Sequence, residues 1–434
     1  MREIRQDKHS GISTLVTDFC SKANCKQRAG RAGRVQSGIC CKLYSSRTAE
    51  ETMRGQSVPE LQRIPLEEVC LNILAGKLSN NCMDFLCQAP QAPSEEAVSK
   101  ALLLLKEVGA IEDSIEKVEK HNLLNNAAFE CLTPLGHHLA KLPVHVRVGK
   151  MLLFGVLFKC LDKVLTIAAS LSTKSPFSNK SFDQSSQQAD SVHKLFAHPT
   201  SDFLTLCNVW EQYHLKRQES TSVARKFCQR NFLNYTALIE IGDMRIQFLQ
   251  LLAQIGFIEK NKGKWYDFDV KGSVYNIYGR NDDVSSAVIC AGLYPNIARI
   301  EKPLNGGIPT LWQRNDQLFF HSSSVNHNKV NFENEWIVFH EKFATRKVFV
   351  TVTSTLHPFS LLIFGKSIRV LHTERKAIID DWIELNVAAQ ISVMFRELRK
   401  KVDIVLQEMV NNVGKEKNPN DDRILQGIID LLSL

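Results

Sequence analysis

The spacing of apolar residues changes along this chain, and that change restricts its possible folds more than any other feature. Between residues 48 and 257, apolar side chains recur every three or four positions, which is typical of amphipathic helices. From about residue 285 the pattern becomes short β-branched and aromatic runs punctuated by Gly, Asn and Pro. At 434 residues the chain is also too long for one ordinary core. We therefore predict a multidomain, mainly α-helical protein with a small β-barrel.

Several helices can be placed from their ends. Pro65 precedes one apolar stripe, and Ser94 is positioned to cap another helix that Gly109 would end. Thr133 followed by Pro134 starts a further helix. The first stripe consists of Leu66, Val69, Cys70, Ile73 and Leu74, and a stripe near the C-terminus consists of Ile391, Phe395, Leu398, Val402, Val405 and Met409.

Five short runs suggest the strands of a small five-stranded barrel. They are rich in β-branched and aromatic residues, and turn residues separate them. The runs are Gln317–Phe320, Trp336–Phe339, Val348–Thr353, Leu361–Phe364 and Ile368–Leu371.

The chain shows no features of a secreted or membrane protein. No secretory signal is recognisable at the N-terminus. The most apolar stretch, Met151–Leu171, contains Lys159, Asp162 and Lys163, so we interpret it as a buried helix pair. The 12 cysteines have no metal-binding spacing and are expected to be reduced. We therefore expect a cytoplasmic or nuclear protein without a membrane partner.

Positive charge is concentrated at the N-terminus. The net charge is +8, and residues 1–47 carry ten Lys or Arg against three Asp or Glu. Within this segment, a helix would place Gln27, Arg31 and Arg34 on one face, at positions i, i+4 and i+7. Two adjacent guanidiniums favour an anion between them, and a triphosphate is a good candidate.

These residues also carry a family resemblance. The run Gln27–Arg34, QRAGRAGR, resembles motif VI of superfamily 2 helicases in the form of the DEAH/RHA branch. Other segments resemble the same family in the same order, and they cover essentially the whole chain. They include Pro59–Arg63, Leu132–Gly136, Leu142–Val144, Ser201–Thr205, Ala291–Asn296 and His321–Asn326, although Ser322 stands where the family usually has proline. The chain is thus similar to the C-terminal part of an ATP-dependent RNA helicase.

The resemblance implies a domain order. It assigns a remnant of the second RecA-like domain, a winged helix, a helical-bundle or ratchet domain, a connecting loop, an OB-fold and a C-terminal helical extension. These correspond in order to residues 1–47, 48–131, 132–257, 258–284, 285–372 and 373–434.

The resemblance also implies roles for individual residues. Arg31 and Arg34 would be catalytic arginine fingers on ATP, and Gln27 would lie beside the nucleotide and its attacking water. ATP and Mg²⁺ would serve the complete enzyme, and RNA would be its partner. Candidate RNA contacts are Lys342, Arg346 and Lys347, although solvated strand residues are at least as good an interpretation.

Parts of the ATP site are missing from the sequence. No Asp-Glu-x-His motif is present, and the only candidate phosphate loop is Gly365-Lys366-Ser367. We reject that loop because strands, with no helix, are expected around it. The first RecA-like domain and most of the second are therefore expected to be absent. We predict negligible ATPase activity and no stable ATP binding by this chain alone.

Two other functions remain open at this stage. The chain could be a non-catalytic RNA-binding module, or a platform for protein partners such as glycine-rich helicase activators. A metal role for the adjacent His137 and His138 is disfavoured, because neighbouring side chains on a helix point apart and no cysteine or carboxylate cluster stands near them in the sequence.

Overall fold

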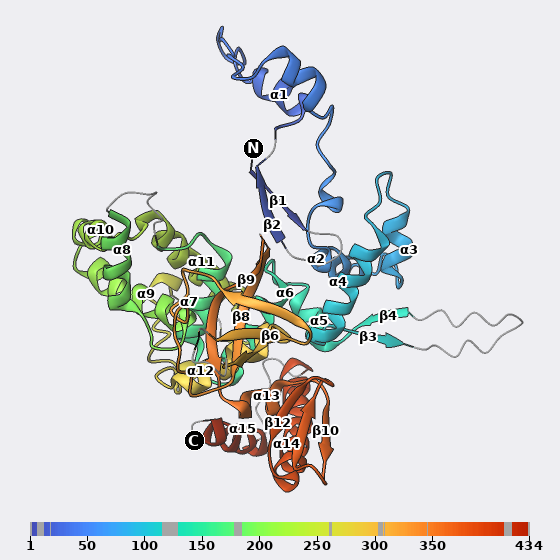
Figure 1. Ribbon diagram of the computed structural model, residues 1–434, viewed down its shortest axis with the longest axis vertical. Coiled ribbons are helices and arrows are strands. Elements are labelled where there is room, and N and C mark those ends of the chain that lie inside the picture. The colour runs from blue at the N-terminus through green and yellow to red at the C-terminus, as the bar shows by residue number, and fades with distance from the viewer. Residues whose placement is uncertain are drawn as a thin grey trace, which may run out of the picture. The chain divides into compact units, whose positions relative to one another are not determined.

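The chain folds into two compact units (Figure 1). The N-terminal unit comprises residues 1–104 and 113–130, and the C-terminal unit comprises residues 105–112 and 131–434. Helices form most of the regular structure, and a closed five-stranded barrel lies in the C-terminal unit. The predicted fold class, mainly helical with one small barrel, is confirmed. The computed structural model describes residues 2–6, 13–17, 19–114, 129–177, 185–259, 263–302, 307, 309–344, 346–411 and 419–432.

The N-terminal unit consists of a hairpin and short helices. Strands β1 (Arg2–Gln6) and β2 (Ser13–Thr17) pair antiparallel. The stripe after Pro65 forms α2 (Glu67–Ala75), and it buries every predicted residue except the half-buried Val69. The remaining short elements are α1 (Lys22–Ala29), η1 (Thr48–Thr52), η2 (Glu60–Gln62) and α3 (Cys82–Cys87).

Helix α4 (Glu95–Val108) spans the boundary between the two units and has the predicted ends. The Ser94 Oγ accepts a hydrogen bond from the Ala97 backbone N at 3.3 Å. Gly109 follows the helix with a φ of +82°, a conformation that favours glycine. Strands β3 (Ile111–Ser114) and β4 (Phe129–Leu132) then pair in a two-stranded sheet.

The predicted helical bundle is confirmed in the C-terminal unit. The Thr133 Oγ1 caps α5 by accepting from the Gly136 backbone N at 3.0 Å, and Pro134 is the first helical residue. The apolar stretch Met151–Leu171 forms the buried helices α6 and α7, and α7 packs on α6, α9 and α11. The bundle elements are α5 (Pro134–Leu139), α6 (Val146–Leu157), α7 (Leu161–Ser172), α8 (Ser185–His193), η3 (Lys194–Phe196), α9 (Asp202–Glu219), α10 (Thr221–Arg230) and α11 (Tyr235–Gln254).

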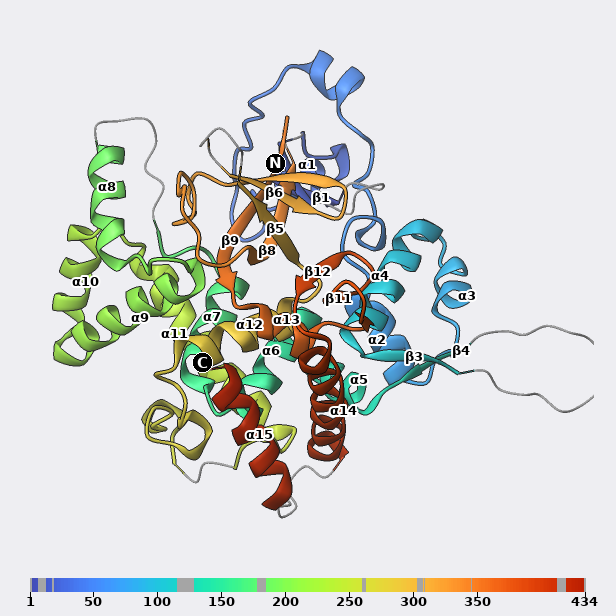
Figure 2. The same ribbon diagram turned by 60° about the horizontal axis from the view of Figure 1, so that its bottom comes forward.

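The segment between bundle and barrel contains more helix than predicted. Two short turns, η4 (Trp265–Asp267) and η5 (Val274–Asn276), lead to α12 (Asp282–Leu293). The Asn281 side chain caps α12, so the helix begins inside the predicted connecting loop 258–284. Helix α12 packs on α6 and against the barrel strands β8 and β9 (Figure 2). Among the described residues, no helix combines the length and apolar character needed to cross a membrane.

The barrel closes in the order β5-β6-β7-β9-β8, and only β7 and β9 run parallel. Its core contains Ala298, Ile300, Leu311, Leu318, Phe320, Phe332, Ile337, Phe339 and Val350. Three of the five predicted strands belong to it, and sequence analysis missed the other two members, β5 and β6. The strands are β5 (Ile297–Glu301), β6 (Thr310–Gln313), β7 (Asp316–Phe320), β8 (Trp336–Ala344) and β9 (Val348–Leu356).

Two predicted barrel strands were wrong. The run Leu361–Phe364 lies in α13 (Pro358–Phe364), because Pro358 occupies the first helical position and the His357 Nδ1 accepts from the Phe359 N at 3.3 Å. A short apolar run does not by itself distinguish a buried strand from a buried helix. The run Ile368–Leu371 is strand β10, but it pairs with β11 (Lys376–Ile379) in a separate three-stranded sheet completed by β12 (Ile383–Asn386).

The predicted C-terminal helical extension, 373–434, therefore begins with two strands before its helices, α14 (Ala389–Asn411) and α15 (Pro419–Leu432). Phe395, Val402 and Val405 are buried on α14 as predicted, whereas Ile391 is 40% exposed. The side chain of Met409 lies outside the described residues.

A half-buried carboxylate joins the bundle to the barrel. Asp202, at the start of α9, accepts hydrogen bonds from the backbone N of Val325 and of Thr353, each at 2.7 Å. The Asn326 Nδ2 donates to the Thr200 carbonyl at 3.1 Å, and Ser201 forms an isolated bridge with Ser354. The first turn of α9 is thus bonded directly to the barrel.

The tight contact at Gly136 gives a stability prediction. A Cβ at this position would lie 2.0 Å from the Ala110 carbonyl oxygen, which is backbone and cannot move aside cheaply. Gly136→Ala is expected to destabilise the C-terminal unit by about 1–3 kcal/mol or more, measured as a lower urea midpoint. The matched control is Gly427→Ala in α15, where nothing lies within 4 Å. It should be neutral or stabilising by up to about 1 kcal/mol. Equal effects of the two substitutions would contradict the packing argument.

Candidate functional site

The segment Gln27–Arg34 is only partly helical, which corrects the face expected from its sequence. The Ser21 Oγ caps α1 by accepting from the Asn24 N at 3.1 Å, and the helix ends at Ala29. Tighter turns follow, in which the Arg31 N donates to the Arg28 carbonyl. Gly33 then adopts a φ of +96°, which directs the chain away from the helix before Arg34.

All three predicted nucleotide-contacting side chains are accessible. Gln27, Arg31 and Arg34 are exposed. Within the part of the chain that the structure describes, no side-chain hydrogen bond or ion pair engages either arginine. Guanidinium groups left open in this way have their donors available for an anion such as a phosphate.

The rejected phosphate loop at Gly365-Lys366-Ser367 is occupied by another partner. The backbone N of Lys366 and that of Ser367 both donate to the Asp380 carboxylate, at 3.2 and 2.7 Å. Strand β10 follows directly. The amides that would have to bind phosphate are therefore used internally, and a carboxylate repels the ligand. The preceding element is helix α13 rather than the expected strand, but the rejection stands.

The barrel carries aromatic and basic side chains together on its outer surface. Phe319 on β7 is the register partner of Phe349 on β9, with ring centroids 6.2 Å apart. The Lys347 Nζ lies 4.3 Å from the centre of the Phe319 ring, and His321 meets Phe349 edge-on at 6.3 Å. We call Phe319, His321, Lys347 and Phe349 the barrel patch. Such a patch can stack bases and contact a phosphate backbone.

Of the three predicted RNA contacts, Lys347 belongs to the barrel patch, and Arg346 is exposed beside it in the β8–β9 turn. Lys342 is half-buried on β8. Burial lowers the pKa of Lys342, and the positive charges of Arg314 and Arg147 lower it further, against the opposing effect of Asp316. The two rings were not predicted as RNA contacts, although the alternation of Leu318, Phe319 and Phe320 indicates that Phe319 points outward.

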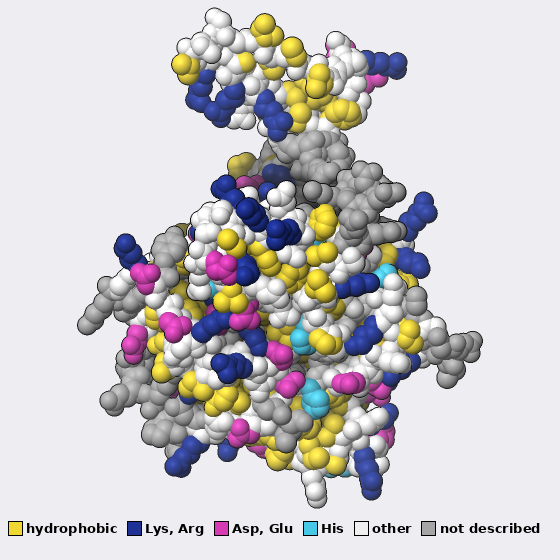
Figure 3. Space-filling view, turned by 90° about the vertical axis from the view of Figure 1, so that its left-hand side faces the viewer, with side chains coloured by type: hydrophobic (Ala, Val, Ile, Leu, Met, Phe, Trp, Pro, Cys, Tyr) yellow, Lys and Arg dark blue, Asp and Glu magenta, His cyan; other side chains and the backbone are white. Residues whose placement is uncertain are grey.

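Charge elsewhere is dispersed. On the face seen in Figure 3, basic side chains are interspersed with acidic ones and with apolar patches, and no single basic field covers it. Arg399 on α14 has only 17% of its side chain exposed and pairs with Asp403 at 3.9 Å.

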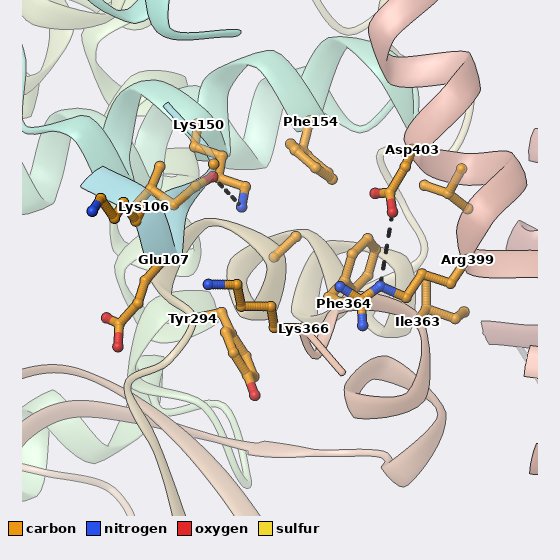
Figure 4. Close-up of a pocket in the computed structure, with 14 residues that line it drawn as sticks. Lys106, Glu107, Lys150, Phe154, Tyr294, Ile363, Phe364, Lys366, Arg399 and Asp403 are labelled. Atoms are coloured by element: carbon orange, nitrogen blue, oxygen red, sulfur yellow. Dashed lines mark hydrogen bonds and ion pairs between the residues drawn. The ribbon is translucent and has the colours of Figure 1, made fainter. Parts of the chain in front are cut away.

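Arg399 lines a cavity of about 170 Å³ between α6, α13 and α14 (Figure 4). The Lys150 Nζ donates to the Val108 carbonyl there at 2.9 Å, and burial lowers the pKa of Lys150 to about 8. A typical small-molecule pocket encloses roughly 300–1,000 Å³. This cavity is therefore too small for a nucleotide. Two of its charged groups, Arg399 and Asp403, pair with each other, and Lys150 bonds to a backbone carbonyl.

The two adjacent histidines differ, because His137 is exposed whereas His138 has a packing contact. His138 packs edge-on against the Phe257 ring at 5.1 Å. Among the described residues, no group of three or more His, Cys, Asp or Glu side chains is arranged to hold a metal ion.

Comparison with known families assigns most of the C-terminal unit. Residues 101–144 match the winged-helix part of the helicase associated domain (HA2), and residues 145–206 match its ratchet-like part. Residues 285–368 match the oligonucleotide/oligosaccharide-binding (OB)-fold, and residues 375–434 match the C-terminal domain in RNA helicases.

Individual relatives match over nearly the full chain. The DExH-box ATP-dependent RNA helicase DExH4, chloroplastic, of Arabidopsis thaliana is 37% identical over 99% of this chain and 31% of its own length. The human ATP-dependent DNA/RNA helicase DHX36 is 35% identical over 100% of this chain and 41% of its own. Human ATP-dependent RNA helicase DHX29 is 34% identical over 99% of this chain and 30% of its own length. The chain thus spans about a third of the length of these relatives.

The partly buried His340 on β8 gives a pH prediction. Its side chain is 19% exposed, and burial, aided by the charge of Arg147, lowers its pKa from 6.5 to about 4. The unfolded chain binds a proton at this histidine near pH 6.5, whereas the folded protein does so only near pH 4. The contribution of neutral His340 to the free energy of unfolding is therefore complete above pH 6.5 and is lost as the pH falls toward 4. His340→Gln should remove up to about 3 kcal/mol of this acid-side loss. The free energy of unfolding of the unsubstituted protein and of His340→Gln is measured in urea at pH 7.5 and pH 5. If both proteins lose the same stability between these pH values, the prediction is wrong.

Proposed function

The chain belongs to the DEAH/RHA family of DExH-box RNA helicases, as a C-terminal portion, and we propose that it supplies arginine fingers and RNA-contacting domains to an ATP-dependent RNA helicase. In this proposal, residues 1–47 are the end of a RecA-like domain. ATP and Mg²⁺ are held mainly by domains outside this chain. Such a protein unwinds or remodels RNA, and the chain alone does not turn over ATP.

One observation carries the proposal. The winged-helix, ratchet, OB-fold and C-terminal family matches follow one another in order from residue 101 to residue 434. Upstream of them, Arg31 and Arg34 are exposed without side-chain partners among the described residues. Accessory helicase domains and open arginines on one chain are best explained by a shared ATP-driven task.

The proposed chemistry follows from what guanidinium groups do. Bound ATP and Mg²⁺ would supply the transferable phosphoryl group and a neutralising divalent charge. Arg31 and Arg34 donate hydrogen bonds to the oxygens on which negative charge develops. Gln27, in the last turn of α1, orients the attacking water. Positioned arginines of this kind contribute roughly 10³–10⁵ in rate.

The barrel patch is the proposed RNA contact in the C-terminal unit. Phe319 and Phe349 offer ring faces for bases, and Lys347 and Arg346 offer charge for phosphates. Further proposed partners are the remaining RecA-like domains, and helicase activator proteins or ribonucleoprotein. We propose a cytoplasmic or nuclear location, although the Arabidopsis relative is named as chloroplastic.

The arginine roles can be tested in the complete protein. Arg31→Ala or Arg34→Ala should lower RNA-stimulated ATP turnover by about 10³-fold or more, because transition-state charge loses its donors, while RNA affinity stays nearly unchanged. Turnover is measured by phosphate release, and affinity by titration with a labelled RNA.

The control is Arg47→Ala, an exposed residue that pairs with Glu51 at 2.9 Å, and it should leave turnover nearly intact. Equal loss of turnover and RNA binding would argue against the finger assignment. Turnover by this chain alone would show that it contains a nucleotide-binding loop that we have rejected.

The RNA surface can be tested on this chain. Lys347→Ala should weaken single-stranded RNA binding and reduce the salt slope by about 0.7 for one lost phosphate contact. Phe319→Ala should cost about 1–3 kcal/mol of binding through lost stacking, with an unchanged salt slope. The affinity and the salt slope of each variant are measured by fluorescence titration with RNA at several salt concentrations.

The matched control is Lys271→Ala, an exposed lysine that pairs with Glu211 at 2.6 Å. If Lys271→Ala weakens binding as much as Lys347→Ala, the interaction is diffuse and the barrel patch is not the contact. Partner binding without any RNA affinity would favour a protein-interaction module instead.

A further inference from the structure

Two cysteines meet at the start of the helix that leads into the arginine segment. The Sγ atoms of Cys20 and Cys25 lie 3.0 Å apart. Cys20 immediately precedes the N-cap Ser21, and Cys25 is the fourth residue of α1. At these two positions, apolar side chains commonly pack together across a helix start, so the contact is set by local helix geometry. The separation is within about 1 Å of a disulfide bond, which is roughly 2.05 Å long.

The backbone around the pair is held in place. The Lys22 N donates to the Arg54 carbonyl at 2.8 Å, and the Ala23 N donates to the Gly55 carbonyl at 3.0 Å. The Asn24 Nδ2 adds a bond to the Ser57 Oγ at 3.2 Å. These contacts anchor the first turn of α1, so the two sulfurs are presented to each other in a defined arrangement. Both cysteines are half-buried and therefore reachable from solvent.

The surroundings make the two thiols unequal. Hydrogen bonds from Tyr44 and then Cys20 lower the pKa of Cys25, and the charges of Arg28 and Lys42 lower it further. The same Cys20–Cys25 hydrogen bond raises the pKa of Cys20. Cys25 is thus the better source of thiolate, and Cys20 is the neighbouring thiol. A lowered pKa next to a second cysteine is the arrangement found at reactive thiols.

We propose that Cys20 and Cys25 form an oxidation site for hydroperoxides. The Cys25 thiolate attacks one oxygen of the hydroperoxide, the O–O bond breaks, and the other oxygen leaves as an alcohol or water after taking up a proton. Cys25 is then a sulfenic acid. The Cys20 sulfur attacks it, the S–O bond breaks, and a second water leaves with the Cys20 proton. Two thiols are oxidised to one disulfide, and the hydroperoxide is reduced by two electrons.

The disulfide would close across the first turn of α1, two residues before Gln27. Its consequence for ATP turnover rests on the proposed function, because it acts on the segment that carries Gln27, Arg31 and Arg34. Its formation does not rest on that function and can be measured on this chain alone.

The first test treats the chain with one equivalent of hydrogen peroxide at pH 7 and maps the products by mass spectrometry. Trypsin cuts after Lys22, so a Cys20–Cys25 disulfide joins two peptides that separate on reduction. We expect this linkage to dominate, with Cys25 reacting about tenfold faster than the exposed Cys87. Cys25→Ser should abolish the linkage, Cys20→Ser should leave a Cys25 sulfenic acid trapped by a cyclic diketone, and the control Cys87→Ser should change nothing.

The proposal is overturned if Cys25 reacts no faster than Cys87, or if linkages to the exposed Cys40 and Cys41 form in equal yield. A second arm oxidises the complete protein. In the protein without substitutions, ATP turnover should fall on oxidation and recover on reduction. In Cys20→Ser, oxidation should leave turnover unchanged. This combination would support control of the arginine segment by the disulfide. If the Cys20–Cys25 disulfide forms but ATP turnover does not change, the proposed control of turnover is wrong, while the oxidation site itself is established.

Discussion

The half-buried Asp202 carboxylate bonds the first turn of α9 directly to the barrel of the C-terminal unit. Burial raises the pKa of this carboxyl, while hydrogen bonds from Thr353 and Val325 favour its charged form. Such a group keeps its donors only if α9 and β9 hold one relative position, because an unpaired buried charge is costly. Strand β9 also carries Phe349 and pairs with β7, which carries Phe319. This carboxylate is therefore one of the contacts that tie the geometry of the barrel patch to the helical bundle.

The arginine segment is built in the opposite way. Val35, Ile39 and Leu43, which follow it, are 99, 91 and 97% exposed. Its guanidiniums have no side-chain partners among the described residues, whereas Arg245 in the bundle is held by Asp162 at 2.6 Å. The segment thus has a fixed helix start and an open, unpacked continuation. An open segment of this kind agrees with our proposal, in which its partners are a phosphate and a RecA-like sheet from outside the chain.

Local signals predicted the helices well, and topology limited the prediction of strands. Ser94, Gly109, Thr133 and Pro134 mark helix ends by capping chemistry that acts within a few residues. Strand β5 was missed because its pairing with β6 and β8 depends on long-range register. The run Leu361–Phe364 was assigned as a strand because apolar length alone does not separate a buried helix from a buried strand.

By itself, the sequence determined the family resemblance, the order of the winged-helix, ratchet and OB-fold domains, and the positions of Arg31 and Arg34, because these reside in residue types at fixed spacings. Only the tertiary structure decided that Arg31 and Arg34 lie beyond the end of α1, that Asp380 occupies the amides of Lys366 and Ser367, and that Phe319 and Lys347 share one surface. Local backbone geometry at the start of α1 also brings Cys20 and Cys25 into contact. The spacing of residues in the sequence does not by itself give these contacts, because backbone direction at helix ends and pairing between distant segments set which side chains meet.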